Sequence, residues 1–149
     1  MGGDELPGAV LFACSMNAVR SPMASALLRH LSNYRVYAKS AGVHTGETDP
    51  FAITVMDELG IDISAHEPVA ITDLHDASFD LVITLSPEAH HQALEFTRTM
   101  AVEVEYWPTM DPALVTGSRE QIIAAYRACR DQLFDRIRAR FQIAGAPEV

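Results

Sequence analysis

The sequence predicts a single α/β domain in which helices cover both faces of a parallel sheet. Short apolar runs alternate with longer amphipathic segments, which is the pattern of successive strand–helix units. A chain of 149 residues is long enough for one ordinary hydrophobic core. Neither linkers, repeats nor low-complexity stretches divide it, so residues 1–149 are expected to form one domain, with a frayed tail at 144–149.

Four short apolar runs are expected to form the strands. They are too short for helices, and continuous apolar runs of this length are typical of strands buried on both faces of a parallel sheet. The runs are residues 9–13, 36–38, 79–85 and 101–106.

Four longer segments place apolar residues at helical spacing and are expected to form helices. They are residues 22–34, 50–59, 87–96 and 119–141. The last segment carries the clearest apolar stripe, which consists of Ile122, Tyr126, Cys129, Leu133 and Ile137.

Several helix ends are marked by capping residues. A Ser or Asp side chain that precedes a proline can cap a helix, and the proline suits the first helical position. The pairs of this kind are Ser21 with Pro22, Asp49 with Pro50 and Ser86 with Pro87. Ser118 and Gln121 have the spacing of a capping box, and Gly60 is expected to stop the second helix.

The chain is acidic, which disfavours binding to nucleic acids and to anionic membranes. Twenty Asp and Glu residues against 11 Lys and Arg give a formal charge of −9 and a pI near 5.0. This field repels nucleic-acid backbones and anionic lipid, so neither a nucleic acid nor a membrane is expected as partner. Any phosphate chemistry must then use a local pocket.

The sequence also predicts a cytoplasmic location. Cys14 and Cys129 are too few for a disulfide framework and fit a reducing compartment. No stretch has the length of a membrane span, and the first residues lack the basic and apolar regions of a secretory signal.

The loop after the first strand is expected to bind phosphate. In an open parallel sheet, ligands lie beyond the carboxyl ends of strands, where backbone N–H groups and a helix N-terminus attract anions. The candidate loop residues are Ser15, Met16, Asn17, Ala18, Val19, Arg20 and Ser21.

Two side chains of this loop suit a reaction. A thiolate is favoured near a helix N-terminus, so Cys14 is a candidate nucleophile, and the guanidinium of Arg20 can grip two oxygens of one anion. A cysteine followed by arginine six positions later is a weak signal alone, but its place at a strand end strengthens it. The alternatives are a buried structural thiol at Cys14 and a plain helix cap at Ser21.

Further motifs follow in order along nearly the whole chain. They are residues 10–14, Asn17, residues 20–24, residues 40–42, Gly46, Asp49 with Pro50, residues 59–61, His66, Trp107, and Asp111 with Pro112. Together they resemble the low-molecular-weight protein tyrosine phosphatases and their relatives, the thioredoxin-coupled arsenate reductases. The resemblance implies a three-layer α/β/α sandwich with a four-stranded parallel sheet.

The resemblance also implies a mechanism without a metal or organic cofactor. Cys14 would attack phosphorus and form a phosphocysteine intermediate, while Arg20 and the loop amides would stabilise the oxygens. Asp111 would protonate the leaving oxygen and then activate the water that clears the intermediate. The residues at family positions that hold the loop in shape are Asn17, Ser40 and His66.

Plainer interpretations exist for several of these residues. Asp111 with Pro112 also suits a turn or cap, residues 40–42 could end a strand in a turn, and His66 could be an ordinary hydrogen-bonded or exposed histidine. Cys129 is expected to be a core thiol. His90 and His91 lack a carboxylate or thiolate at ligand spacing, so they are expected to be solvated and not to bind metal.

Three departures from the family pattern concern the pocket. Met16 replaces the usual glycine, so backbone strain and a narrower pocket mouth are expected there. Val19 replaces a second loop cysteine, which leaves Cys14 without an adjacent disulfide partner. Ala113 stands where tyrosine is common, and residues 43–45 contain no aromatic, so a phosphotyrosine ring loses part of its stacking wall.

The sequence therefore predicts a cysteine-dependent phosphatase that acts on a phosphotyrosine protein or on a small aryl or alkyl phosphate. An arsenate reductase is the alternative, but it would need an external thiol, because Ser86 stands where those reductases have their first relay cysteine. A non-catalytic phosphate- or phosphoprotein-binding module is the third. Cys14, Arg20 and Asp111 together argue against it, because binding alone needs neither thiol nor acid.

Overall fold

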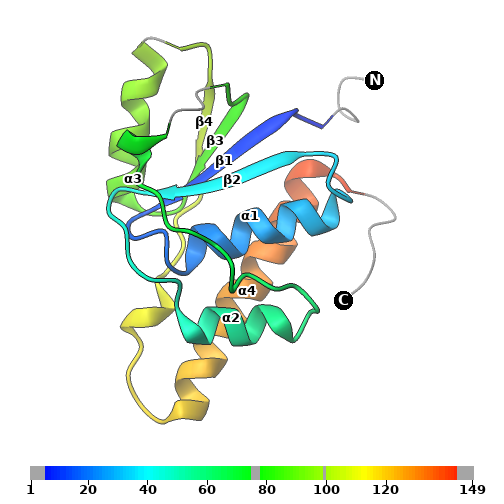
Figure 1. The fold of residues 1–149 in the computed structure, drawn as a ribbon, viewed down its shortest axis with the longest axis vertical. Helices are drawn as coiled ribbons and strands as arrows, with labels where there is room; N and C mark the ends of the chain where they lie inside the picture. The colour runs from blue at the N-terminus through cyan, green and yellow to red at the C-terminus, as the bar shows by residue number, and fades with distance from the viewer. Residues whose placement is uncertain (1–5, 75–77, 99, 144–149) are drawn as a thin grey trace.

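A computed structural model describes residues 6–74, 78–98 and 100–143 as a sheet sandwiched between helices (Figure 1). The predicted four-stranded parallel sheet and three-layer arrangement are confirmed. The strands, in the order β2-β1-β3-β4, are β1 (Ala9–Cys14), β2 (Tyr37–Gly42), β3 (Leu81–Thr84) and β4 (Glu103–Tyr106). The predicted frayed tail at 144–149 lies outside the described residues.

Helices cover both faces of the sheet, as Figure 1 shows. They are α1 (Arg20–Leu31), α2 (Pro50–Asp57), α3 (Pro87–Ala93) and α4 (Arg119–Phe141). Strand β1 serves both layers because alternate side chains point to opposite faces. Val10 and Phe12 pack with α1, α2 and α4 in the larger core cluster, whereas Leu11 and Ala13 pack with α3 in the smaller one.

The capping residues were predicted correctly at three helices. Asp49 caps α2 by accepting from the N–H of Phe51, and Ser86 caps α3 by accepting from Ala89. Ser118 and Gln121 form the predicted capping box at the start of α4.

The prediction that Ser21 caps the first helix is wrong. Helix α1 begins at Arg20 and not at residue 22, and Val19 precedes it without a capping side-chain hydrogen bond. Ser21 is the second residue of the helix. Its hydroxyl does not cap the helix, because it contacts Cys14, the side chain of Asn17 and the carbonyl of Ala41. The helix also ends at Leu31, short of the predicted residue 34, and left-handed Asn33 and Tyr34 follow.

Further boundaries differ from the predictions: β1 ends one residue later than predicted, and β3 and β4 each begin two residues later. Strand β2 continues to Gly42 and was predicted too short, because Lys39 and Ser40 interrupt the apolar pattern. Helix α2 ends at Asp57, three residues before Gly60, which has the left-handed φ of +76°. Helix α3 ends at Ala93 and passes into a 3-10 helix, Leu94–Arg98.

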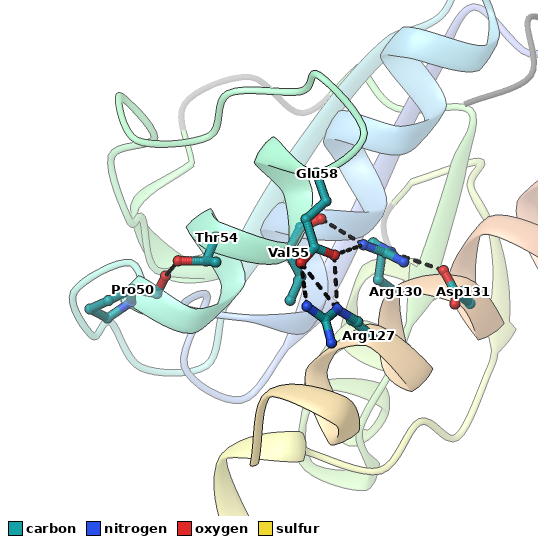
Figure 2. Close-up of polar contacts among 7 residues, drawn as sticks. All are labelled: Pro50, Thr54, Val55, Glu58, Arg127, Arg130 and Asp131. Carbon is teal, nitrogen blue, oxygen red and sulfur yellow. Dashed lines mark hydrogen bonds and ion pairs between the residues drawn. The ribbon is translucent and has the colours of Figure 1, made fainter. Parts of the chain in front are cut away.

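A polar cluster joins α2 to α4 on the helical side (Figure 2). Glu58 accepts hydrogen bonds from Arg127 and from Arg130. Arg130 also donates to the carbonyl of Val55 at 2.8 Å and to Asp131 at 2.9 Å. Helix α2, which follows the loop segment beside the candidate site, is thereby fixed to the longest helix.

The carboxyl ends of all four strands lie at one edge of the sheet, where α1 begins. Gly42 ends β2 there, and a Cβ at this position would lie 2.7 Å from the backbone nitrogen of Asn17. Only glycine therefore lets β2 approach the loop so closely. In the part of the chain that the structure describes, no helix is long and apolar enough to cross a membrane.

Candidate active site

The loop between β1 and α1 turns its peptide groups in a consistent direction. The carbonyls of Ser15, Met16 and Ala18 accept hydrogen bonds of 2.7–3.0 Å from backbone N–H groups in the segment 44–49. In a trans peptide the C=O and the following N–H point in opposite directions. The N–H groups that follow these carbonyls therefore face away from that segment, toward the loop's interior, where an anion can accept from them.

A cavity of about 90 Å³ lies at this loop. Its lining comes from three separate parts of the chain, and two of them contribute predicted site residues. The lining residues are Cys14, Met16, Ala18, Val19, Arg20, Asp49, Asp111 and Ala113.

Cys14 ends β1 at the cavity, and its side chain is buried beside a hydroxyl. Its Sγ lies 2.9 Å from the Oγ of Ser21, which also lies 3.3 Å from the carbonyl of Ala41. A serine hydroxyl has one proton to donate, so it can turn from that carbonyl to a thiolate. The structure thus places a hydrogen-bond donor where a charged sulfur would need one.

Asn17 is the residue of the loop that adopts the left-handed conformation, with a φ of +54°. Strain was expected at Met16, but the left-handed residue is its neighbour, and asparagine tolerates this region better than most residues. The side chain of Asn17 stabilises the turn on both sides. Its Nδ2 donates to Ser21 at 2.9 Å and to Ser40 at 3.0 Å.

The Oδ1 of Asn17 joins the loop to the segment before the third strand. It accepts from the N–H of Val69 at 2.9 Å and lies 3.2 Å from Nε2 of His66. Burial lowers the pKa of His66, so the neutral ring with its proton on Nε2 suits this contact. The structure therefore brings Asn17, Ser40 and His66 together around the base of the loop.

Arg20 and Asp111 face each other across the cavity. Nη2 of Arg20 lies 3.8 Å from Oδ2 of Asp111, while Nη1 donates to the carbonyl of Thr109 at 2.9 Å. The other carboxylate oxygen of Asp111 caps the 3-10 helix η4 (Pro112–Leu114) by accepting from Ala113. The cap interpretation and the acid interpretation are thus compatible, because each uses a different oxygen.

Asp49 and Thr109 are site residues that the sequence analysis did not identify as such. Asp49 was predicted as a helix cap and counted among the family motifs, but it was given no part in the site, yet it lines the cavity. A signal existed, since Asp49 with Pro50 repeats the pairing of Asp111 with Pro112. Thr109 acts through its backbone carbonyl, which carries no sequence signal.

The other candidate residues lie outside the cavity lining. Ser86 accepts from the hydroxyl of Ser15 at 3.1 Å, so the position of the missing relay cysteine touches the loop. Cys129 is a core thiol of α4, as predicted, and burial raises its pKa to about 12.

The expectation that His90 is solvated is wrong. Its ring stacks on Tyr106 with centroids 4.6 Å apart, and Nδ1 lies 3.0 Å from the hydroxyl of Thr84. His91 is exposed. Among the residues that the structure describes, no group of three or more His, Cys, Asp or Glu could hold a metal ion.

Comparison with known proteins identifies the family. Residues 9–142 match the model of the family described as low molecular weight phosphotyrosine protein phosphatase. The chain belongs to this family. An arsenate reductase of Bacillus licheniformis is 36% identical to it over 140 residues, which cover 91% of this chain and 96% of that one.

Solved structures of family members share the fold. The tyrosine phosphatase amsI of Erwinia amylovora superposes with a TM-score of 0.76 over 92% of this chain and 93% of that one, at 18% identity. The arginine phosphatase YwlE, in a mutant with a phosphorylated active-site serine, gives a TM-score of 0.72 at 26% identity, over 91% and 93% of the two chains; a YwlE mutant structure is from Bacillus subtilis. Enzymes of the family are thus named as phosphatases or arsenate reductases.

Proposed function

We propose that this protein hydrolyses phosphomonoesters through a phosphocysteine intermediate. The observation that carries the proposal is that Cys14, Arg20 and Asp111 converge on one cavity of about 90 Å³. A binding site for phosphate needs the arginine and the loop amides, but it needs neither a thiol nor an acid. The three together match the needs of a displacement at phosphorus.

In the first step the thiolate of Cys14 attacks phosphorus and the bond to the leaving oxygen breaks. The hydroxyl of Ser21, 2.9 Å from Sγ, stabilises the thiolate before the attack. Arg20 and the loop N–H groups stabilise the charge on the equatorial oxygens. Asp111 donates its proton to the leaving oxygen, so the alcohol departs neutral.

In the second step water attacks the phosphorus of phosphocysteine. Asp111, now a carboxylate, takes the proton of that water, and the sulfur of Cys14 leaves as a thiolate. Inorganic phosphate is released and the starting state is restored. A reaction that depends on a reduced thiol fits the reducing cytoplasm that the cysteine usage indicates.

The test is phosphate release from phenyl phosphate between about pH 5 and 7.5, with a reductant and without added metal. We expect turnover that disappears in Cys14→Ser, while that variant still binds inorganic phosphate. A phosphorylated Cys14 should be trapped by rapid acid quenching of the wild-type protein. Turnover that survives in Cys14→Ser would exclude the mechanism, and binding without turnover in both proteins would favour a phosphate-binding module.

A second candidate is arsenate reduction with an external thiol, favoured by the 36% identity to an arsenate reductase. Arsenate has the charge and shape of phosphate, so Cys14 could displace water from it and form a sulfur–arsenic bond. An external thiol would then complete a disulfide with Cys14 while arsenic gains two electrons. Arsenate-dependent oxidation of glutathione, absent in Cys14→Ser, would support this activity.

A further inference from the structure

Asp49 connects the loop between β1 and α1 to the helical layer. Its backbone N–H donates to the carbonyl of Ala18 at 3.0 Å, which is one of the contacts that turn the peptide groups of the loop. In a trans peptide the N–H of Val19 then points the opposite way, toward the cavity that Val19 lines. The direction of this N–H therefore depends on where Asp49 is held.

Both carboxylate oxygens of Asp49 accept hydrogen bonds, and the donors belong to two different helices. Oδ1 accepts from the N–H of Phe51 at 2.8 Å, which caps α2. Oδ2 accepts at 2.8 Å from the hydroxyl of Tyr126, a residue of α4 that lies 77 positions away in the sequence. The cap fixes Asp49 only relative to its own helix, whereas the contact with Tyr126 also fixes it relative to α4.

Tyr126 is itself buried and packed. It is 2% exposed, and its ring contacts Phe51 with centroids 5.3 Å apart. Burial, and then the hydrogen bond to Asp49, raise the pKa of Tyr126, so its hydroxyl keeps the proton that it donates. A hydrogen bond to a carboxylate is stronger than one between neutral groups, so this contact can hold Asp49 in place.

Helix α2 is thus joined to α4 at both of its ends, but only one of the two contacts leads to the loop. At the far end Glu58 accepts from Arg127 and Arg130 (Figure 2). Among the residues that the structure describes, neither Glu58 nor these arginines line the cavity, whereas Asp49 does. The two contacts therefore allow a role in stability to be separated from a role in positioning.

We propose that Tyr126 is a positioning residue of the candidate active site, whose hydroxyl holds Asp49 where the backbone N–H of Asp49 turns the N–H of Val19 toward the oxyanion. This inference rests on the proposed phosphatase function, in which loop N–H groups stabilise the equatorial oxygens. Tyr126 does not line the cavity and acts through Asp49 and Ala18. Helix α4 thereby sets the geometry of a loop that belongs to the other end of the sequence.

Tyr126→Phe tests the proposal, because it removes the hydroxyl and keeps the ring that packs on Phe51. We expect kcat/KM for phenyl phosphate to fall about five- to twentyfold, which is less than the loss of a whole oxyanion donor, since the N–H of Val19 remains but is held less well. The affinity for inorganic phosphate should fall by a smaller factor, because the loop stabilises the transition state more than the ground state.

A second substitution tests whether Tyr126 acts through Asp49. Asp49→Ala breaks the same chain of contacts at its next link and should lower kcat/KM at least as far as Tyr126→Phe does. Adding Tyr126→Phe to Asp49→Ala should then change kcat/KM by less than about twofold, because the two residues act on one path. A further loss as large as that in Tyr126→Phe alone would overturn the proposal.

The amide signal of Val19 is a readout that a purely structural role of Tyr126 would not move. In an assigned amide NMR spectrum of the wild type, inorganic phosphate should shift this signal downfield, because the N–H donates to an oxyanion. In Tyr126→Phe saturated with phosphate the shift should be smaller. A shift as large as that of the wild type, or a wild-type kcat/KM, would overturn the proposal.

Glu58→Gln is the matched control. It weakens the other contact between α2 and α4 and should cost stability without reaching the loop. We expect its kcat/KM and its Val19 signal in phosphate to match those of the wild type. An equal loss of activity in Glu58→Gln would overturn the proposal, since Tyr126 would then act only through the stability of α2.

Phosphate binding separates this inference from the proposed function. If the wild type does not hydrolyse phenyl phosphate, the phosphatase function fails, and the Val19 signal still decides whether Tyr126 positions the loop. If phosphate leaves that signal unmoved in both proteins, the positioning role is overturned. If the wild type hydrolyses phenyl phosphate and Tyr126→Phe matches it, the positioning role fails and the phosphatase function stands.

Discussion

At the scale of single residues, the loop depends on a few side chains that each serve several partners. Asn17 adopts a left-handed φ and contacts Ser21, Ser40 and the segment around His66. Ser21 in turn lies 2.9 Å from the sulfur of Cys14. A change in one of these residues therefore reaches the nucleophile through one or two hydrogen bonds.

Asp111→Asn tests the acid. Asparagine keeps a carbonyl oxygen, so it can still cap η4 by accepting from Ala113, but it cannot supply a proton. We expect kcat for phenyl phosphate to fall about 10²- to 10⁴-fold, the usual contribution of general acid catalysis. An unchanged melting temperature is the control, and a wild-type rate would return Asp111 to the role of a cap.

Met16→Ala tests the narrowing of the mouth. The left-handed residue of the loop is Asn17 and not Met16, so alanine fits the backbone at position 16 without strain. Removing the partly exposed thioether should raise kcat/KM for naphthyl phosphate relative to phenyl phosphate several-fold. The same ratio in both proteins would show that Met16 does not limit the size of the substrate.

At the scale of elements, the sequence predicted well where local chemistry marks a boundary. Asp49, Ser86 and Ser118 cap their helices as expected, since each cap involves residues within three positions. The errors arose where distant groups decide. Ser21 follows the capping pattern, but its hydroxyl is used by Cys14 and Asn17, contacts that no local pattern reveals.

Some site residues could be predicted from local sequence and others could not. Cys14 and Arg20 lie six positions apart around one loop, so local sequence alone indicated a nucleophile and an anion-binding arginine. Asp111 came from the resemblance to a family and not from its local pattern. Asp49 was missed as a site residue because only the folded chain brings it to the cavity that Cys14 and Asp111 also line, although these residues lie 35 and 62 positions away in the sequence.

Two arginines of α4, Arg127 and Arg130, bind Glu58 at the end of α2 but differ in burial, so their substitutions should differ in their effect on stability (Figure 2). Arg130 is 8% exposed and bonds to Val55 and Glu58, so Arg130→Ala should lower the free energy of unfolding by about 2–3 kcal/mol. The side chain of Arg127 is 45% exposed, so solvent screens its ion pair and Arg127→Ala should lower the free energy of unfolding much less than Arg130→Ala does. Urea denaturation measures both, and equal losses would show that burial does not distinguish them.

At the scale of the whole molecule, the net negative charge disfavours both the binding of an oxyanion and the compact folded state. The net charge of −9 repels an oxyanion, so binding depends on the local N–H groups and Arg20. The same excess of acid makes the chain repel itself near neutral pH. Carboxylates with cationic partners are the exceptions, since they stabilise the folded state only while they are ionised.

Glu58 makes this dependence on pH measurable. Hydrogen bonds from Arg127 first, and then Arg130, lower its pKa from 4.5 to about 2. Between these two pH values the unfolded chain binds more protons than the folded one, so the free energy of unfolding falls as the pH falls. The contribution of Glu58 is therefore complete above about pH 4.5 and is lost as the pH approaches 2.

Comparing the wild type with Glu58→Gln isolates this contribution from the other carboxylates. The side chain of Glu58 is 33% exposed, so solvent screening limits its effect at pH 7 to about 1 kcal/mol. Urea midpoints at constant ionic strength should differ between the two proteins at pH 7 and converge as the pH falls from about 5 toward 2.5. If the difference were constant over this range, Glu58 would act through packing and not through its charge.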